Sequence, residues 1–83
     1  MYLIIQSKWI RGSSQNGERL VNSCSRLREA RGLVRHHFKS HLEMVMKHMY
    51  WDDFDLSEEE CWIVLADEEG IFYYSKFFFK EDV

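Results

Sequence analysis

The sequence predicts an α+β fold in which one long amphipathic helix packs on one face of a small antiparallel sheet of three or four strands. Three observations predict it: apolar residues recur at helical spacing across 25–49, a β-prone run opens the chain, and two β-prone runs joined by a turn close it. With 83 residues, the chain is expected to form a single domain, 1–83.

The helix is predicted from residue 25 to residue 49, because the apolar side chains there share one stripe of the helical wheel and most charged ones lie opposite. A helix of this length spans about 37 Å, which is long for so small a domain. The alternative is a break near Ser40, with Met44–Tyr50 then forming a strand. The stripe stays in phase through Met49, which favours one continuous helix. Its members are Leu27, Ala30, Leu33, Val34, Phe38, Leu42, Val45 and Met49.

The first strand is predicted at Tyr2–Ile10, which is rich in β-branched and aromatic residues. Its first residues are apolar on both faces, which is typical of a strand inside a sheet rather than at its edge. Residues 12–17 supply the glycine, serine and asparagine of a turn. Residues 18–22 are open to two interpretations, a short second strand or an extended lead-in to the helix.

Residues 50–56 are predicted to form a loop, and Cys61–Ala66 a buried strand, because four large apolar residues follow one another there. Asp67–Gly70 is predicted to form a hairpin turn before a last strand, Ile71–Phe79. Both faces of that strand carry aromatic rings, and one helix covers only one of them. The other face is expected to present tyrosine and phenylalanine side chains to solvent or to a partner.

The net charge of −3 hides an asymmetry between two segments. Residues 19–47 contain seven Lys or Arg and two acidic residues, whereas residues 52–69 contain nine acidic residues and no Lys or Arg. One interpretation is a solvated loop attracted to the chain's own basic helix. The other is an acidic patch that binds a basic partner.

Size and composition narrow the classes of function. A chain this short buries only about 60% of its unfolded surface, so a deep substrate pocket is not expected and a binding surface is favoured. Cys24 and Cys61 are expected to be buried and reduced, and the first residues lack the basic leader of a signal peptide. No apolar run approaches the ~20 residues of a membrane span. The sequence therefore predicts a cytoplasmic protein.

The residue types that commonly carry catalysis or bind metals do not form a recognisable motif in this sequence. His37 and His41 have a spacing that zinc sites use on helices, but His48 lies about 10 Å farther along the axis, too far to bind the same ion. The acidic residues from Asp52 resemble the start of a calcium loop, but Ser57 stands where that loop requires glycine. The chain has no glycine-rich phosphate loop and no activated nucleophile. We therefore predict no enzyme activity, no metal and no cofactor.

The basic helix is the feature that favours nucleic acid as a partner. Its Lys and Arg residues do not form a single stripe, and a net acidic chain is repelled by phosphate groups. Direct nucleic-acid binding is therefore not the leading prediction, and a small nucleic-acid-binding module that uses the basic helix remains an alternative.

The layout resembles that of small phage-encoded anti-CRISPR proteins, many of which are acidic and place one or more helices on a small antiparallel sheet. The likeness covers the architecture of the whole chain, and no functional residue is carried over from it. It implies that the protein binds a subunit of a CRISPR–Cas complex in the host cytoplasm and blocks its nucleic-acid channel or a conformational step. The segments that carry the likeness are Tyr2–Ile5, Asn16–Arg19, Ser25–Ala30 and Glu68–Gly70.

These observations together predict a small non-enzymatic protein-binding inhibitor, an anti-CRISPR protein if the resemblance extends to function. Its partner is expected to be a protein with a basic surface, such as a Cas subunit, and no membrane. The rival prediction is a homodimerising structural or assembly subunit that pairs through the edge of the last strand. The predicted partner-binding residues are Trp51, Asp52, Asp53, Phe54, Asp55, Glu58, Glu59, Glu68, Glu69, Tyr74 and Phe78.

Overall fold

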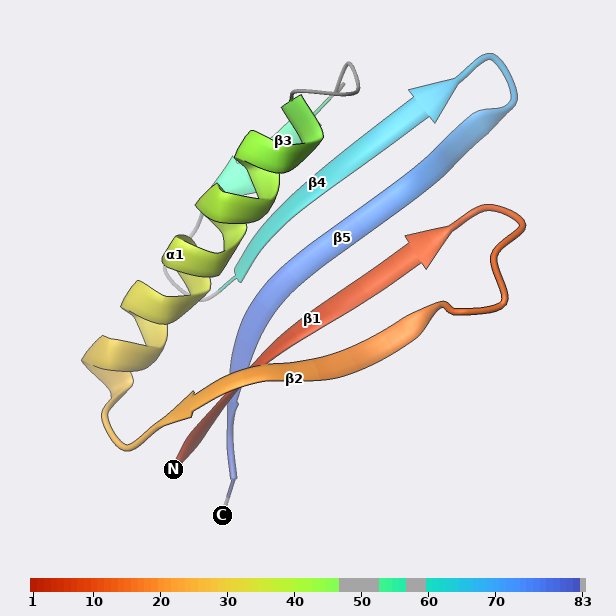
Figure 1. Cartoon of the computed structure of the whole chain (residues 1–83). Helices are drawn as coiled ribbons and strands as arrows, with labels where there is room; N and C mark the ends of the chain where they lie inside the picture. The colour runs from red at the N-terminus through yellow and green to blue at the C-terminus, as the bar shows by residue number, and fades with distance from the viewer. Residues whose placement is uncertain (47–52, 57–59, 83) are drawn as a thin grey trace.

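The chain forms an antiparallel sheet with one helix across one of its faces, as Figure 1 shows. This structure is a computed structural model, and it describes residues 1–46, 53–56 and 60–82. The predicted α+β architecture is confirmed. The elements in chain order are β1 (Tyr2–Ile10), β2 (Gly17–Cys24), α1 (Leu27–Met46), β3 (Asp53–Leu56), β4 (Glu60–Asp67) and β5 (Gly70–Glu81).

The described strands form one sheet in the order β2-β1-β5-β4-β3, and every neighbouring pair is antiparallel. The first and last strands pair along almost their whole lengths, from Tyr2 opposite Glu81 to Ile10 opposite Tyr73. This pairing brings the two ends of the chain to the same end of the molecule (Figure 1). It also places β1 between β2 and β5, which confirms the prediction that the opening strand lies inside the sheet.

The position of β5 corrects one prediction. Residues 71–79 were expected to offer a free edge for pairing with a second copy, but β5 is the middle strand and pairs with β1 on one side and β4 on the other. Its backbone groups are therefore already engaged along both sides, and edge-to-edge dimerisation through this strand is excluded in this fold. Aromatic residues on both faces are consistent with this central position, because rings on a central strand pack against side chains of the strands to either side.

Two further strands differ from the sequence prediction. The ambiguous segment 18–22 belongs to a full strand, β2, which has a bulge at Val21 between the pairs Ile4–Asn22 and Ile5–Leu20. The predicted loop 50–56 is wrong for its second half, because Asp53–Leu56 pairs with β4 as the strand β3. Among the described residues the sheet therefore has five strands, whereas three or four were expected.

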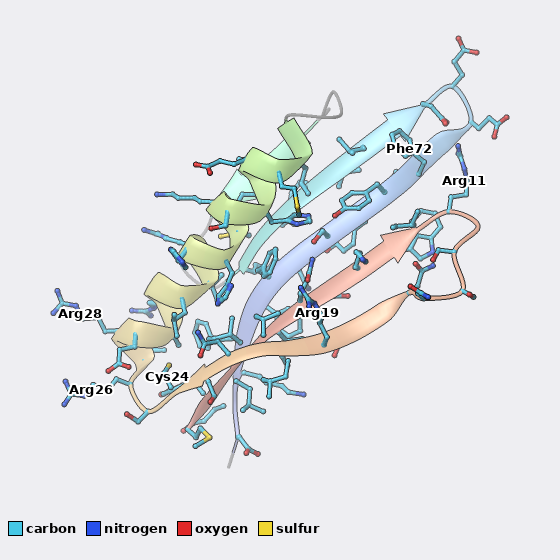
Figure 2. All side chains as sticks on the ribbon, in the orientation of Figure 1. Arg11, Arg19, Cys24, Arg26, Arg28 and Phe72 are labelled. Atoms are coloured by element: carbon cyan, nitrogen blue, oxygen red, sulfur yellow. The ribbon has the colours of Figure 1, made fainter. Side chains whose placement is uncertain are left out.

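The helix α1 runs without a break past Ser40 to Met46, so residues 44–46 are helical and not part of a strand. Residues 47–49 of the predicted helix lie outside the described residues. The buried side of α1 carries Ala30, Val34 and Phe38, all fully buried. Figure 2 shows Arg26 and Arg28 at the start of the helix pointing away from the sheet.

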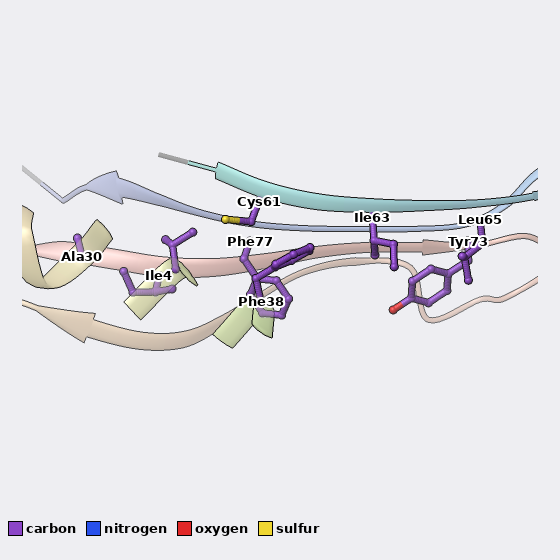
Figure 3. Packing of buried hydrophobic residues seen from close by; sticks show 9 residues of the cluster. Ile4, Ala30, Phe38, Cys61, Ile63, Leu65, Tyr73 and Phe77 are labelled. Atoms are coloured by element: carbon purple, nitrogen blue, oxygen red, sulfur yellow. The ribbon is translucent and has the colours of Figure 1, made fainter. Parts of the chain in front are cut away.

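The core lies between α1 and the helix-facing residues of β1, β4 and β5, and Figure 3 shows these side chains close up. The ring of Phe38 meets the ring of Phe77 edge to face, with centroids 6.4 Å apart. This is a favourable geometry for aromatic pairs. Cys61 is fully buried in this cluster as predicted, whereas Cys24 is only half-buried, and both are free thiols. Within the described segments, no helix has the length and apolar character to cross a membrane.

Glycine substitutions test this backbone. Gly32 lies in the helix with an exposed position and open space around an added Cβ atom. Gly32→Ala is therefore expected to raise the free energy of unfolding by up to about 1 kcal/mol, measured by urea denaturation. The matched control is Gly70→Ala at the start of β5, where φ is +115° and the same substitution is expected to destabilise the protein. A loss of stability in Gly32→Ala would contradict the open surroundings of this position.

Candidate functional site

The sheet has one face that the helix does not cover, and we call it the open face. Side chains alternate along each strand, so the residues between the buried ones point to this side. The described side chains of the open face are largely apolar or aromatic. They are Leu3, Ile5, Ser7, Trp9, Leu20, Trp62, Val64, Tyr74, Lys76 and Phe78.

The register of the strands aligns these residues in rows. Trp9 lies opposite Tyr74, which lies opposite Val64. In the next row on this face Ser7 lies opposite Lys76, which lies opposite Trp62. In the row after that, Ile5 lies opposite Phe78. Ile5 is only 5% exposed although no helix covers it, because neighbouring side chains on the open face close around it. The open face therefore carries two rows of apolar and aromatic residues, separated by a row that contains Ser7 and Lys76.

The rim of the open face is partly hollowed and partly charged. Leu3, Ile5 and Leu20 line a shallow depression of about 260 Å³ together with Lys80. Leu20 at its edge is 61% exposed. Next to Phe78, the ammonium group of Lys76 lies 4.9 Å from the ring centroid and 3.6 Å from a carboxylate oxygen of Glu60. Both the cation–π contact and the ion pair hold this lysine along the sheet.

The structure brings some of the predicted partner-binding residues to the open face. Tyr74 and Phe78 are there, both half-buried, as predicted for the uncovered side of the last strand. Asp53 and Asp55 occupy register positions beside Val64 and Trp62, in the same cross-strand rows, and Phe54 lies between them in β3. Four other predicted residues lie outside the described part of the chain: Trp51, Asp52, Glu58 and Glu59.

The remaining two predicted residues form the tip of the β4–β5 hairpin. Glu68 and Glu69 are exposed there, and the side chain of Glu69 is 83% exposed. The tip is partly neutralised, because the guanidinium of Arg11 donates two hydrogen bonds to Asp67 and lies 3.8 Å from Glu69. The hydrogen bond to Arg11 lowers the pKa of Asp67. Figure 2 shows Arg11 beside Phe72 at this end of the sheet.

A second surface lies on the other side of the sheet, where α1 leaves part of β1 and β2 uncovered (Figure 1). It is an open groove of about 470 Å³ between the helix and the sheet, and His37, His41 and Phe77 line it. The small size of the chain predicted no deep substrate pocket, and this groove is a depression that is open to solvent. The groove is open because the helix spans one side of a five-stranded sheet and the sheet is wider than the helix.

The two histidines in the groove pack on aromatic rings. The ring of His37 stacks on Phe77 with centroids 6.3 Å apart, and the ring of His41 stacks on Tyr73 with centroids 6.0 Å apart. His41 Nε2 also lies 2.5 Å from the hydroxyl oxygen of Tyr73. Both side chains are half-buried, which places them at the border between the buried and the exposed sides of α1.

Burial sets the charge of these groups. It lowers the pKa of His41 and of His37, and the nearby cations Lys8 and Arg19 lower the pKa of His41 further. Burial also raises the pKa of Tyr73, and a hydrogen bond to Ser75 opposes part of that shift. The lowered pKa of His41 and the raised pKa of Tyr73 favour the uncharged imidazole and the protonated hydroxyl, and the two groups share one hydrogen bond.

Sequence reasoning missed a buried polar pair on the neighbouring strands β1 and β5. Gln6 and Ser75 are both buried polar side chains, and the amide of Gln6 donates to the Ser75 hydroxyl at 3.2 Å. A polar residue in an otherwise apolar strand was the available signal, since buried polar groups require partners. Within residues 1–46, 53–56 and 60–82, no group of three or more His, Cys, Asp or Glu is arranged to hold a metal ion.

Comparison with known proteins adds no family to this geometry. The chain matches no protein-family model, and no curated protein or solved structure matches it.

The lowered histidine pKa values predict how stability depends on pH. The unfolded chain binds protons on histidine near pH 6.5, whereas folded His37 and His41 bind them only at lower pH. The unfolded state therefore holds more protons in this window. The free energy of unfolding should therefore be highest above about pH 6.5 and should decrease as the pH falls below this value. Denaturation at several pH values measures this, and His41→Asn should flatten the slope.

Ring resonances provide the direct check. Proton NMR titration should place the midpoint of His41 below the ordinary value of about 6.5. A midpoint at or above that value, or a pH slope unchanged in His41→Asn, would contradict the buried, neutral imidazole.

Proposed function

We propose that this protein is a small non-enzymatic inhibitor that binds another protein through the open face of its sheet. The observation that carries the proposal is the apolar surface that includes Trp9, Tyr74 and Phe78 and that no element of the described chain covers. Half-exposed aromatic rings on a rigid sheet lose little conformational entropy on binding, and such rings dominate interface energetics.

The distribution of acidic residues in the chain indicates which kind of partner surface is complementary. The acidic residues of the chain are concentrated in segment 52–69, which contains β3 at one edge of the sheet and all of β4. Asp53 and Asp55 share cross-strand rows with the open face, and Glu68 and Glu69 stand at its end. The complementary partner is a protein with an apolar patch bordered by lysine and arginine, because opposite charges around an apolar centre steer association.

A subunit of a nucleic-acid-guided defence complex fits this description, because its nucleic-acid channel is lined by basic side chains. This is the partner that the resemblance to anti-CRISPR proteins implies. In this mechanism the protein occupies the basic surface and prevents nucleic acid from entering, or holds the complex in one conformation. No catalytic step on this chain is required.

Matched surface variants test the proposal. Tyr74→Lys places a charge in the centre of the open face, whereas Arg35→Glu changes an exposed residue of the helix. A partner captured from host lysate by the unmodified protein is purified and its affinity measured by surface plasmon resonance. Tyr74→Lys is expected to weaken binding at least about tenfold, and Arg35→Glu is expected to leave it unchanged.

Three outcomes overturn the proposal. In the first, the purified partner binds Tyr74→Lys as tightly as the unmodified protein. In the second, no captured protein discriminates between the two variants. In the third, light scattering finds a dimer of the unmodified protein that Tyr74→Lys converts to a monomer, which assigns the open face to a second copy of the chain.

A charge reversal tests the electrostatic part separately. Replacing Asp53 and Asp55 by Lys is expected to lower the association rate constant more than it raises the dissociation rate constant. The effect should shrink as salt is added, because the acids act over distances that salt screens. The control is Glu81→Lys at the far end of β5. Association rates that do not respond to salt would show that the acidic segment does not steer the partner.

A further inference from the structure

Beside the groove between α1 and the sheet, a connected set of polar side chains comes from three strands. Arg19 Nε on β2 donates to Gln6 Oε1 on β1 at 2.9 Å. The amide nitrogen of Gln6 then donates to Ser75 Oγ on β5. Gln6 is 4% exposed and Ser75 is fully buried, so these hydrogen bonds hold the arginine in one position. Figure 2 shows Arg19 reaching from β2 over the helix-facing side of the sheet.

The charge of this region is positive and uncompensated within the described chain. Neither Arg19 nor Lys8 forms an ion pair there with a described carboxylate, unlike Arg11, which is engaged by Asp67. The groove continues past Gln6 and Arg19 into a smaller depression of about 170 Å³ that Lys8 and Asn16 also line. Glu18 borders that depression, and its strand neighbour Ser7 lies on the open face. The interior of the groove therefore presents cations without acids.

We propose that this groove binds the phosphate or carboxylate group of a small organic anion. The oxyanion would lie against Arg19 and the imidazole rings of His37 and His41. The groove lies on the opposite side of the sheet from the partner surface proposed for the open face, and the two surfaces meet at Arg19 and Leu20 on β2.

The donors are arranged for an oxyanion. Arg19 uses only Nε for Gln6, which leaves its two terminal nitrogens to form a paired contact with a carboxylate or phosphate. The Tyr73 hydroxyl engages Nε2 of His41, and Nδ1 of the same ring donates to a ligand once the imidazole is protonated. The side-chain amide of Asn22 lies 3.4 Å from Nε2 of His37 and orients that ring in the same way.

The other residues that line the groove determine the chemistry of the non-anionic part of the ligand. Val21 and Met44 contribute apolar side chains beside the polar network, and Phe77 forms the floor under the histidines. A volume of about 470 Å³ accepts a small molecule and not a folded domain. The ligand class is therefore an anionic group attached to a small, partly apolar body.

Binding should be linked to protonation of the histidines. The groups that face His37 and His41 are His36 on the helix, Arg19 and Lys8 on the sheet, and the neutral Tyr73 hydroxyl, and none of these is an anion. A bound anion adds the missing negative charge and favours the imidazolium form. The affinity should therefore increase as the pH falls toward the histidine pKa, since proton uptake accompanies binding.

NMR titration of the unmodified protein tests this site with three probes: phenyl phosphate, benzoate and the neutral benzyl alcohol. The anions are expected to produce saturable shifts of Arg19 Nε–H and of the His37 and His41 rings, and benzyl alcohol is not. Comparing the two anions distinguishes a phosphate from a carboxylate preference. Benzoate stays ionised between about pH 6 and about pH 8, so any gain in its affinity at the lower pH reports the histidines.

The matched variants are Arg19→Gln and Arg28→Gln, the second at an exposed position near the start of α1. Arg19→Gln should weaken anion binding at least about tenfold, Arg28→Gln should leave it unchanged, and Arg19→Lys should restore part of it. The proposal is overturned if neither anion saturates these resonances by about 10 mM. Equal losses in Arg19→Gln and Arg28→Gln, or equal binding of benzyl alcohol, would also overturn it.

Discussion

The packing of α1 on β5 is the interaction on which the rest of the molecule depends. Phe38 meets Phe77 at the centre of the core, and Val34 and Ala30 extend the contact toward the start of the helix. A single helix has one apolar stripe, so it closes only part of one face of a sheet that is five strands wide. The open face and the groove beside the helix are both consequences of this mismatch in width.

The pairing of β1 with β5 supports that core from within the sheet. The two ends of the chain form neighbouring central strands, so most of the sequence must be present before the sheet is complete. Loop closure of this span is costly in entropy, and long-range pairings of this kind are associated with slow folding. The hydrogen bond between Gln6 and Ser75 joins the same two strands across 69 residues of sequence. This hydrogen bond adds a specific polar contact to the pairing of β1 with β5, in which the other side chains are mainly apolar.

The helix was predictable because apolar residues recur along α1 with the helical period of 3.6 residues. The strand β1 was predictable because its first residues form a continuous apolar run. β3 was not, since its four residues alternate acid and apolar within a segment whose composition is typical of loops. The central place of β5 was indicated by rings on both faces but was interpreted as an exposed edge. Of the candidate site, Tyr74 and Phe78 followed from alternation, whereas the groove depends on Gln6, Arg19 and Ser75, which meet only through strand order and the bulge at Val21.

The two proposed surfaces lie back to back on the same strands, and alternation keeps them chemically separate. Ile5 points to the open face and its neighbour Gln6 to the groove, and Phe78 and Phe77 divide in the same way on β5. A substitution on one face therefore changes side chains that the other face does not contact directly. The exception is displacement of the backbone, which both faces share. For this reason a loss of anion binding in an open-face variant would indicate a shift of β1 or β5 rather than a shared site, and amide chemical shifts along these two strands would report that shift.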